Sequence, residues 1–334
     1  MNKTVFPNIT IAIPTFNEEK RIDTCLKSIF RQNYPYKKLE VIVVDDYSQD
    51  KTVQIAQKYP IKILYNGAHD GEVGKMIAFK KSKGEFFYYL DADCELKGKD
   101  CLKKLIKPLM EDRTLAASFT RNYARKDAPA LERYYSMHPT QCDPIYEFFS
   151  PSIANTVVEK RGDYQVCEYS LNKIPPAGHC VFRREFLWPL VKNKKKFMEL
   201  DFLVVLVENG FNRFAYVPQA GVYHHHVSSL VELLKKRSRN VQRVYLPEVE
   251  KRKYRWFDLK KPGDLFKIFL WIIYAHLFFP SLIRGIFKSV KYKDWAGLYE
   301  PIVTLLVTDV IIFSFLSNKK GRKFIQESLS SINE

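Results

Sequence analysis

The chain has 334 residues, of which 46% are hydrophobic and 14% aromatic, enough for a large core in one or two domains. Lysine and arginine exceed the acidic residues by 17, a balance that fits binding to nucleic acid, to an anionic membrane or to an anionic substrate. No helix-turn-helix, zinc-finger or aromatic RNA-binding signature accompanies this charge, which disfavours nucleic acid.

The first 90 residues alternate short apolar runs with segments of helical spacing. The order predicts an α/β fold in which helices cover both faces of a mostly parallel, doubly wound sheet. No Gly-x-Gly-x-x-Gly or Walker loop follows a strand, which disfavours dinucleotide and P-loop sites. Strands are predicted over residues 9–14, 39–44, 61–65 and 85–90, and helices over 18–32, about 52–60 and 74–82.

Two carboxylates follow the most apolar of these strands. Residues Glu85–Leu90 read as a strand buried on both faces, and Asp91 and Asp93 come directly after it. Ligands of such sheets bind at the carboxyl ends of the strands, where carboxylate oxygens can hold a hard divalent cation. The segment therefore predicts a cation site at that edge.

The pattern is weaker between residues 112 and 174, where we expect a strand, a helix around Leu131–Met137 and loops. The six cysteines include no Cys-x-x-Cys pair and are predicted to be buried free thiols in a reducing compartment. No basic segment followed by an apolar one precedes Ile9, so no secretory signal is expected. Further strands are predicted over 180–182 and 213–218, and helices over 185–191, 200–209 and from Ser228 onward.

Two apolar segments, Ile268–Ile283 and Pro301–Leu316, change the composition after Tyr254. As helices, each would be about 24 Å long, shorter than the ~30 Å hydrocarbon core of a bilayer. Basic residues lie both between and after them, against the positive-inside bias of a two-helix span. We expect in-plane helices on an anionic membrane; a shallow or spanning hairpin and a soluble helical tail are the alternatives.

Three motifs at successive strand ends, Ile11–Glu18, Val41–Thr52 and Tyr89–Asp93, resemble those of the family 2 glycosyltransferases. The resemblance covers roughly residues 9–245. It implies a GT-A fold and a metal-dependent, inverting transfer of sugar from a UDP- or GDP-sugar to a hydroxyl of a membrane-associated acceptor, such as a lipid-linked saccharide. We therefore expect a transferase domain over residues 1–250 and a membrane-associating helical region over 251–334, at the cytoplasmic face of the membrane.

The resemblance also implies roles for residues of the donor site. Asp93 would ligate a divalent cation, Mg²⁺ or Mn²⁺, and Asp91 would contact the ribose or a metal-bound water. Asp46 would recognise the base or ribose of the nucleotide. Glu18 is expected to make another nucleotide contact, with backbone groups of Pro14 and Thr15 nearby.

Two more donor-side candidates are less specific. Lys75 follows Gly74 at a predicted helix N-terminus, which suits either a diphosphate contact or a solvated surface lysine. The family often has a histidine near the diphosphate or metal, and the triple histidine 224–226 occupies that place. His224 is the first candidate and His226 the second, because alternation along an extended segment puts both on one face.

The acceptor side is expected downstream. The segment Pro176–Glu185 resembles the family's small-residue segment and arginine pair, so Gly178 and Arg183 are predicted to line it. The catalytic base is predicted at Glu199 or Asp201, since an inverting displacement needs a base opposite the leaving group. The family's usual Glu-Asp pair is missing there, and an N-capping role for Asp201 stays open.

Three other functions remain to be separated from this one. Transfer to a polyprenyl phosphate would need no strong base, because the nucleophile is already an anion. A non-catalytic nucleotide-sugar or polysaccharide-binding protein could use the same scaffold. A nucleic-acid-binding module would bind with steep salt dependence.

Overall fold

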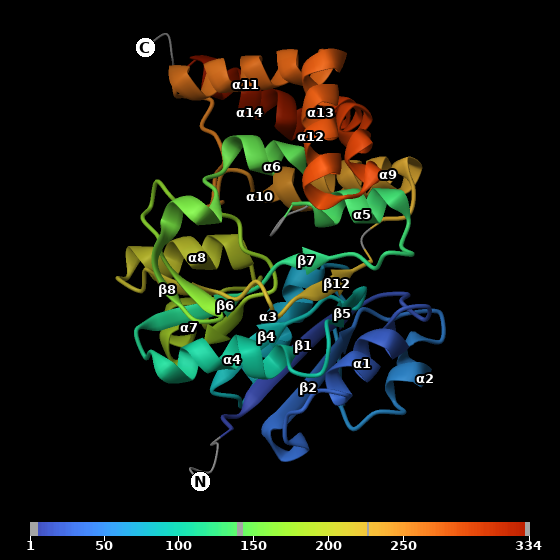
Figure 1. The fold of residues 1–334 in the computed structure, drawn as a ribbon, viewed down its shortest axis with the longest axis vertical. Coiled ribbons are helices and arrows are strands. Elements are labelled where there is room, and N and C mark those ends of the chain that lie inside the picture. The colour runs from blue at the N-terminus through green and yellow to red at the C-terminus, as the bar shows by residue number, and fades with distance from the viewer. Residues whose placement is uncertain (1–5, 139–142, 226, 331–334) are drawn as a thin grey trace. The chain divides into compact units, whose positions relative to one another are not determined.

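The computed structural model describes residues 6–138, 143–225 and 227–330, which fold into two compact units (Figure 1). Met1–Tyr123 and Ser152–His224 form the first unit, and Ala124–Pro151 and His225–Glu334 form the second. The chain therefore passes from the first unit into the second and back before it ends in the second. The domain boundary predicted at residue 250 stays a prediction.

A nine-stranded sheet forms the centre of the first unit, in the order β3-β2-β1-β4-β10-β6-β11-β9-β8. The first four strands in this order all run parallel. The α/β fold class with a large, mostly parallel sheet is confirmed. These four strands are β1 (Ile9–Thr15), β2 (Leu39–Asp45), β3 (Lys62–Tyr65) and β4 (Phe86–Tyr89).

The other half of the sheet mixes directions: β10 is antiparallel to both β4 and β6, whereas β6 and β11 are parallel. A second, three-stranded sheet has the order β5-β12-β7. The strands of the larger sheet are β6 (Leu115–Phe119), β8 (Val157–Arg161), β9 (Tyr164–Glu168), β10 (Val181–Arg183) and β11 (Arg213–Tyr216). Those of the smaller sheet are β5 (Cys94–Leu96), β7 (Asn122–Tyr123) and β12 (Val222–His224).

Helices pack apolar side chains against both faces of the large sheet. On one face Ile11 and Ile13 share a buried cluster with Leu26 of α1. On the other, the Phe87 ring lies 4.8 Å from that of Phe79 on α3. The described cysteines are buried free thiols, as predicted, and Cys142 lies outside the described residues. The helices of this unit are α1 (Ile22–Phe30), α2 (Thr52–Ala56), α3 (Gly71–Lys81), α4 (Cys101–Glu111), α7 (Arg184–Val191) and α8 (Glu199–Glu208).

The second unit is helical and contains a buried ionic cluster. Glu300 is fully buried and accepts hydrogen bonds from Lys288 Nζ at 2.7 Å and from the Tyr134 hydroxyl at 2.7 Å. Lys288 also donates to Glu147 at 3.0 Å. Its main helices are α5 (Ala130–Ser136), α6 (Pro144–Phe149), α9 (Leu230–Asn240), α10 (Leu246–Glu248), α11 (Pro262–His276), α12 (Phe278–Tyr292), α13 (Glu300–Ser317) and α14 (Lys319–Ser330).

The apolar segments after Tyr254 differ from the sequence expectation. Residues 268–283 do not form one helix, because α11 and α12 meet at Leu277 with a bend of 81°. Pro280 explains the break, since its ring would clash with the carbonyl of residue 276 in a continuous helix. The second segment is longer than expected: Trp295–Ser317 is continuous over 23 residues, long and apolar enough to cross a membrane by length and composition.

Candidate functional site

The carboxyl ends of the parallel strands bring several predicted residues together. The Asp46 amide donates to the Thr15 carbonyl at 2.9 Å, which joins the ends of β2 and β1. The Leu90 amide donates to the Ala12 carbonyl, so Asp91 follows on the other side of β1. Because β1 lies between β2 and β4, this edge is where the strand order reverses, the usual place for a ligand in such sheets.

Asp46 is buried beside the loop that follows β3. One carboxylate oxygen accepts the His69 amide at 3.2 Å, and the other lies 3.5 Å from His69 Nδ1. The backbone of Thr15 and Pro14 ends β1 next to it. Asp46 therefore holds the β3 loop against the end of the sheet, at the position predicted for a nucleotide contact.

Three residues after these strand ends have a left-handed backbone. The φ angles are 54° at Asn17, 58° at Tyr47 and 49° at His69. Such angles are uncommon outside glycine and gather at functional sites. Tyr47 is 56% exposed and stacks at 5.4 Å on Tyr65, which is 51% exposed. The turn at Tyr47 and the end of β3 at Tyr65 thus expose two stacked aromatic rings, which were not among the predicted site residues.

Glu18 lies where β1 passes into α1. Its amide donates to Thr52 Oγ1 at 2.7 Å, and its carbonyl accepts the Ile22 amide that opens the helix. Its carboxylate lies 3.6 Å from the Arg21 guanidinium. Glu18 therefore joins the loops after β1 and β2.

Lys75 is buried among three carboxylates. Its side chain is 6% exposed, and Nζ lies 3.2 Å from Glu72, 3.6 Å from Asp91 and 3.5 Å from Glu199. It also lies 4.6 Å above the centre of the Tyr89 ring. Lys75 is therefore not a solvated surface lysine. It joins Asp91, on the donor side of the site, to Glu199, a predicted base at the start of α8.

Burial and the neighbouring charges shift the pKa values of Lys75 and Asp91 in opposite directions. Burial lowers the pKa of Lys75, but Asp91, Glu199 and Glu72 outweigh it and raise that pKa well above its ordinary value. Burial raises the pKa of Asp91, yet Lys75 brings the net value below the ordinary one. Burial raises the pKa of Glu72 to about 8. The cluster therefore keeps a buried cation beside an ionised Asp91. Glu72 was not among the predicted site residues, because no local pattern marks it.

A second cluster surrounds Asp93. His224 Nε2 lies 3.5 Å from Asp93 Oδ1, and Cys94 Sγ lies 3.7 Å from His179 Nε2. Donor atoms of Cys94, His179 and His224 all lie within 4.8 Å of one another. The register of β5 and β12 pairs Cys94 with His224 directly. Pairing between strands far apart in the sequence thus builds a group that could hold a metal ion.

His179 was missed as a site residue, although it follows the predicted Gly178. Its φ is 53°, so the left-handed position falls on the histidine and not on the glycine. Burial lowers the pKa of His179 to about 4, which keeps its imidazole neutral, the form that ligates metals. Among the described residues, nothing hydrogen-bonds its Nδ1. His226, the second histidine candidate, lies outside the described residues.

Arg183 is not brought to this group. The register of β10 pairs it with Phe86, at the start of β4, whereas Asp91 follows the other end of that strand. Its guanidinium donates to the carbonyls of Leu109 and Leu115, tying α4 to β6. Asp201 lies in the first turn of α8, with Glu199. The binding and catalytic roles given to the candidate site residues stay predictions.

Comparisons with known proteins place the chain in a family. The model described as "Glycosyl transferase family 2" matches residues 10–189, more than half of the chain, and confirms the resemblance found in the sequence. The chain is 38% identical over 90 residues to poly(ribitol-phosphate) beta-N-acetylglucosaminyltransferase TarS of Staphylococcus aureus, a stretch that covers 25% of this chain and 16% of that protein.

A second relative, from Methanococcus voltae, is a dolichyl N-acetyl-alpha-D-glucosaminyl phosphate 3-beta-D-2,3-diacetamido-2,3-dideoxy-beta-D-glucuronosyltransferase. The two are 35% identical over 91 residues, 25% of this chain and 28% of that one. The matches thus span less than a third of the length of these two relatives. Among solved structures, the mannosyltransferase PcManGT from Pyrobaculum calidifontis, in complex with GDP-Man and Mn²⁺, is similar with a TM-score of 0.49 and 16% identity, covering 99% of this chain and 87% of that one.

Proposed function

Because the chain belongs to glycosyl transferase family 2, we propose that it transfers a sugar, with inversion, from a nucleotide-diphosphate donor to a hydroxyl of a membrane-associated acceptor. The observation that carries the proposal is the meeting of Asp46, Asp91 and Asp93 at one edge of the sheet, with Lys75 between Asp91 and Glu199. This edge offers groups for each part of such a donor and for the acceptor hydroxyl.

The nucleoside end of the donor would bind where β1, β2 and β3 end. The Asp46 carboxylate can accept hydrogen bonds from the base or ribose, and the exposed rings of Tyr47 and Tyr65 can stack on a base. Backbone groups of Thr15 and Pro14 lie next to Asp46. A UDP- or GDP-sugar fits this combination of polar and aromatic groups.

The residues around Asp93 fit a divalent cation. Two imidazoles and one thiol converge there, and Asp93 Oδ1 lies 3.5 Å from His224 Nε2 and 3.7 Å from Cys94 Sγ. The neutral His179 needs to lose no proton to ligate. Nitrogen and sulfur ligands favour Mn²⁺ or a softer ion over Mg²⁺. Bound there, the cation would neutralise charge on the departing diphosphate as a Lewis acid. Asp93 and His224 are the proposed ligands.

Glu199 is the proposed base. Lys75 lies 3.5 Å from Glu199 and 3.6 Å from Asp91, so the ion pair holds the Glu199 carboxylate at a set distance from the donor side. Glu199 would take the proton of the acceptor hydroxyl as that oxygen attacks the anomeric carbon and the bond to the diphosphate breaks. Asp201, two residues further along the same helix, is the second candidate.

The second unit is proposed to hold the protein at the cytoplasmic face of the membrane. It exposes many large apolar side chains on α11 and α12. The name of the Methanococcus voltae relative describes a lipid-linked acceptor, a dolichyl phosphate saccharide, which is consistent with a membrane-associated acceptor for this chain. The region 251–334 would supply most of this attachment.

The substitution Asp93→Ala tests the proposal. It should abolish both transfer and donor hydrolysis while the thermal-unfolding midpoint stays within a few degrees of wild type. The assay incubates protein, Mn²⁺ and a panel of UDP- and GDP-sugars, and measures nucleoside diphosphate release. Asp163→Ala, on the first unit but in the turn between β8 and β9, is the matched control and should retain activity. Full activity in Asp93→Ala would overturn the assignment.

A further inference from the structure

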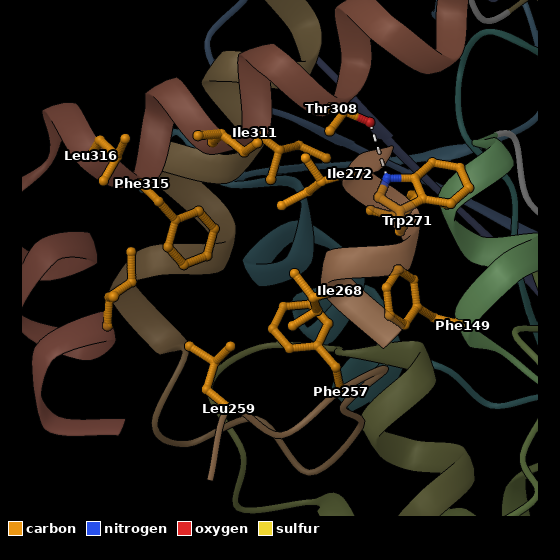
Figure 2. Close-up of a pocket in the computed structure, with 13 residues that line it drawn as sticks. Phe149, Phe257, Leu259, Ile268, Trp271, Ile272, Thr308, Ile311, Phe315 and Leu316 are labelled. Atoms are coloured by element: carbon orange, nitrogen blue, oxygen red, sulfur yellow. Dashed lines mark hydrogen bonds between the residues drawn. The ribbon is translucent and has the colours of Figure 1, made fainter. Parts of the chain in front are cut away.

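The second unit contains an apolar pocket between its helices (Figure 2). Its volume is about 170 Å³. The walls come from α6, α11, α13, α14 and the loop before α11, and include Phe149, Phe257, Ile268, Trp271, Ile311 and Phe315. All of these side chains lie within the second unit, so the pocket is complete without any residue of the first.

The chemistry of the walls selects a hydrocarbon. Among the described residues that line the pocket, Thr308 carries the one hydroxyl group, and it accepts a hydrogen bond from Trp271 Nε1 at 3.0 Å (Figure 2). A polar group entering the pocket would lose its water and find that partner already engaged, which is unfavourable. An aliphatic chain loses no hydrogen bond on entry and gains burial.

The size of the pocket indicates a single chain. A cavity of about 150 Å³ lined by leucine, isoleucine and phenylalanine holds one benzene molecule, which has six carbons. By that measure the pocket accommodates about six or seven carbons. A protein helix or a second copy of the chain would be too wide to enter, whereas a lipid tail can insert one part of its length and leave the rest outside.

Helix α12 indicates that hydrocarbon lies next to this unit. Its apolar side chains Phe279, Ile283, Phe287 and Val290 are each 65–74% exposed, whereas Lys288 is buried against Glu300. This orientation is the reverse of that of a helix facing water, because it exposes the apolar side chains and buries the charged one. In a bilayer it is the favourable one. The helix therefore has the pattern of a membrane-facing surface.

Helix α11 places the pocket beside such a surface. Ile268, Trp271 and Ile272 line the pocket, whereas the alternate positions Phe269 and Ile273 are exposed. One helix thus separates the pocket from an exposed apolar face of the same unit. A lipid chain from a membrane on that face would need to pass only around α11.

Cations flank the pocket along the chain. Exposed Lys319, Lys320, Arg322 and Lys323 stand between the lining residues Leu316 and Ile325, in the first turns of α14. Cations at a helix N-terminus oppose the helix dipole, and an anion bound there would relieve that repulsion. Basic clusters of this kind attract phosphate headgroups of membrane lipids.

We propose that this pocket binds the hydrocarbon chain of a phosphate-bearing membrane lipid, whose headgroup is held by the basic residues that begin α14. The proposal rests on the membrane attachment in the proposed function but not on catalysis. Its test measures binding, so its failure and a failure of the transferase assignment can be told apart.

The experiment uses the full chain and a series of n-alkyl phosphates, from butyl to dodecyl, below their micelle concentrations. Titration calorimetry should show affinity rising about four-fold for each added methylene, then levelling off once about six carbons fill the pocket. Alkyl glucosides of equal chain length should bind at least ten-fold more weakly. Replacing Lys319, Lys320, Arg322 and Lys323 by glutamine should remove that preference.

Adjacent residues of α11 provide matched variants. Ile272→Trp fills the pocket and should abolish the dependence on chain length, whereas Ile273→Trp, on the exposed side, should keep it. Ile272→Ala enlarges the pocket and should move the plateau to longer chains, which keeps the test decisive if the tryptophan variant does not fold. Equal dependence of affinity on chain length in Ile272→Trp and Ile273→Trp would overturn the proposal. It would also be overturned if the wild-type chain bound no alkyl phosphate and only associated with further copies of itself.

Discussion

Replacing Lys75 by methionine removes the one cation from the group formed with Glu72, Asp91 and Glu199. Methionine keeps most of the volume of the buried stem, so packing changes little. At about 3.5 Å and an effective dielectric of ~20, each carboxylate attracts the ammonium by about 5 kcal/mol. Burying the cation costs several kcal/mol, and removing one partner of a buried ionic group costs about 3–5 kcal/mol. We expect the free energy of unfolding of Lys75→Met to be lower than that of wild type by about 3–5 kcal/mol at pH 8.

The loss should depend on pH in a defined direction. Lys75 is the main group that lowers the pKa of Asp91, so without it the pKa of Asp91 in the folded protein rises above its unfolded value of 3.8. Lys75 also restrains the already raised pKa of Glu72. The folded variant then binds more protons than the unfolded chain, and its stability falls as pH rises. The difference from wild type should shrink to about 1 kcal/mol near pH 4, where Asp91 and Glu72 of the folded variant are protonated.

Urea-unfolding midpoints of wild type and Lys75→Met at pH 4, 6 and 8 measure this difference. If thermal unfolding is used instead, a loss of 4 kcal/mol in the free energy of unfolding corresponds to a fall of roughly 8–16 °C in Tm for a unit of this size. Lys80→Met, on the exposed side of the same helix, is the matched control and should change stability by less than about 0.5 kcal/mol at every pH. A destabilisation by Lys75→Met that is the same at pH 4 and pH 8 would refute the reasoning.

Two further pairs of substitutions examine the base and the packing of the second unit. Glu199→Gln should lower kcat by at least a hundred-fold with little change in donor affinity, whereas Asp201→Asn should lower kcat less than ten-fold. A larger loss of kcat in Asp201→Asn than in Glu199→Gln would make Asp201 the base. If neither substitution lowered kcat, a phosphate acceptor would be favoured. Gly285→Ala should destabilise by about 1–3 kcal/mol, because its Cβ would lie 2.8 Å from the Gly297 carbonyl oxygen. Gly263→Ala, which meets open space, should be neutral by thermal unfolding.

Local patterns predicted much of the first unit. The alternation of apolar runs and helical spacing located the strands that end near Thr15, Asp46 and Asp91, because each signal lies within one short segment. Since the carboxyl ends of parallel strands share one edge of the sheet, the proximity of these residues at that edge could also be predicted from the sequence. The predicted start of a helix near Ser229 was right for the same reason, since Ser229 caps α9.

Contacts between distant segments could not be predicted in this way. Glu72 and Glu199 are 127 positions apart, and only the folded chain shows that Lys75 joins them. The pairing of Cys94 with His224 depends on the register of two short strands, and no local signal sets that register. Arg183 lies in a segment that was located correctly, but the antiparallel direction of β10 takes its side chain away from Asp91.

The way the chain divides between its two units has a consequence for its synthesis. Residues 124–151 belong to the second unit, yet Tyr134 and Glu147 find their partners Glu300 and Lys288 only near the end of the chain. At about 5–20 residues per second, a ribosome needs roughly 7–30 s to reach Glu300 after residue 151. During that interval the insertion emerges with its buried side chains uncovered, whereas the first unit needs only residues up to His224 to complete its sheets. The nascent chain would therefore carry a folded sheet domain interrupted by a segment whose buried side chains still lack their partners, a state in which chaperones can engage it.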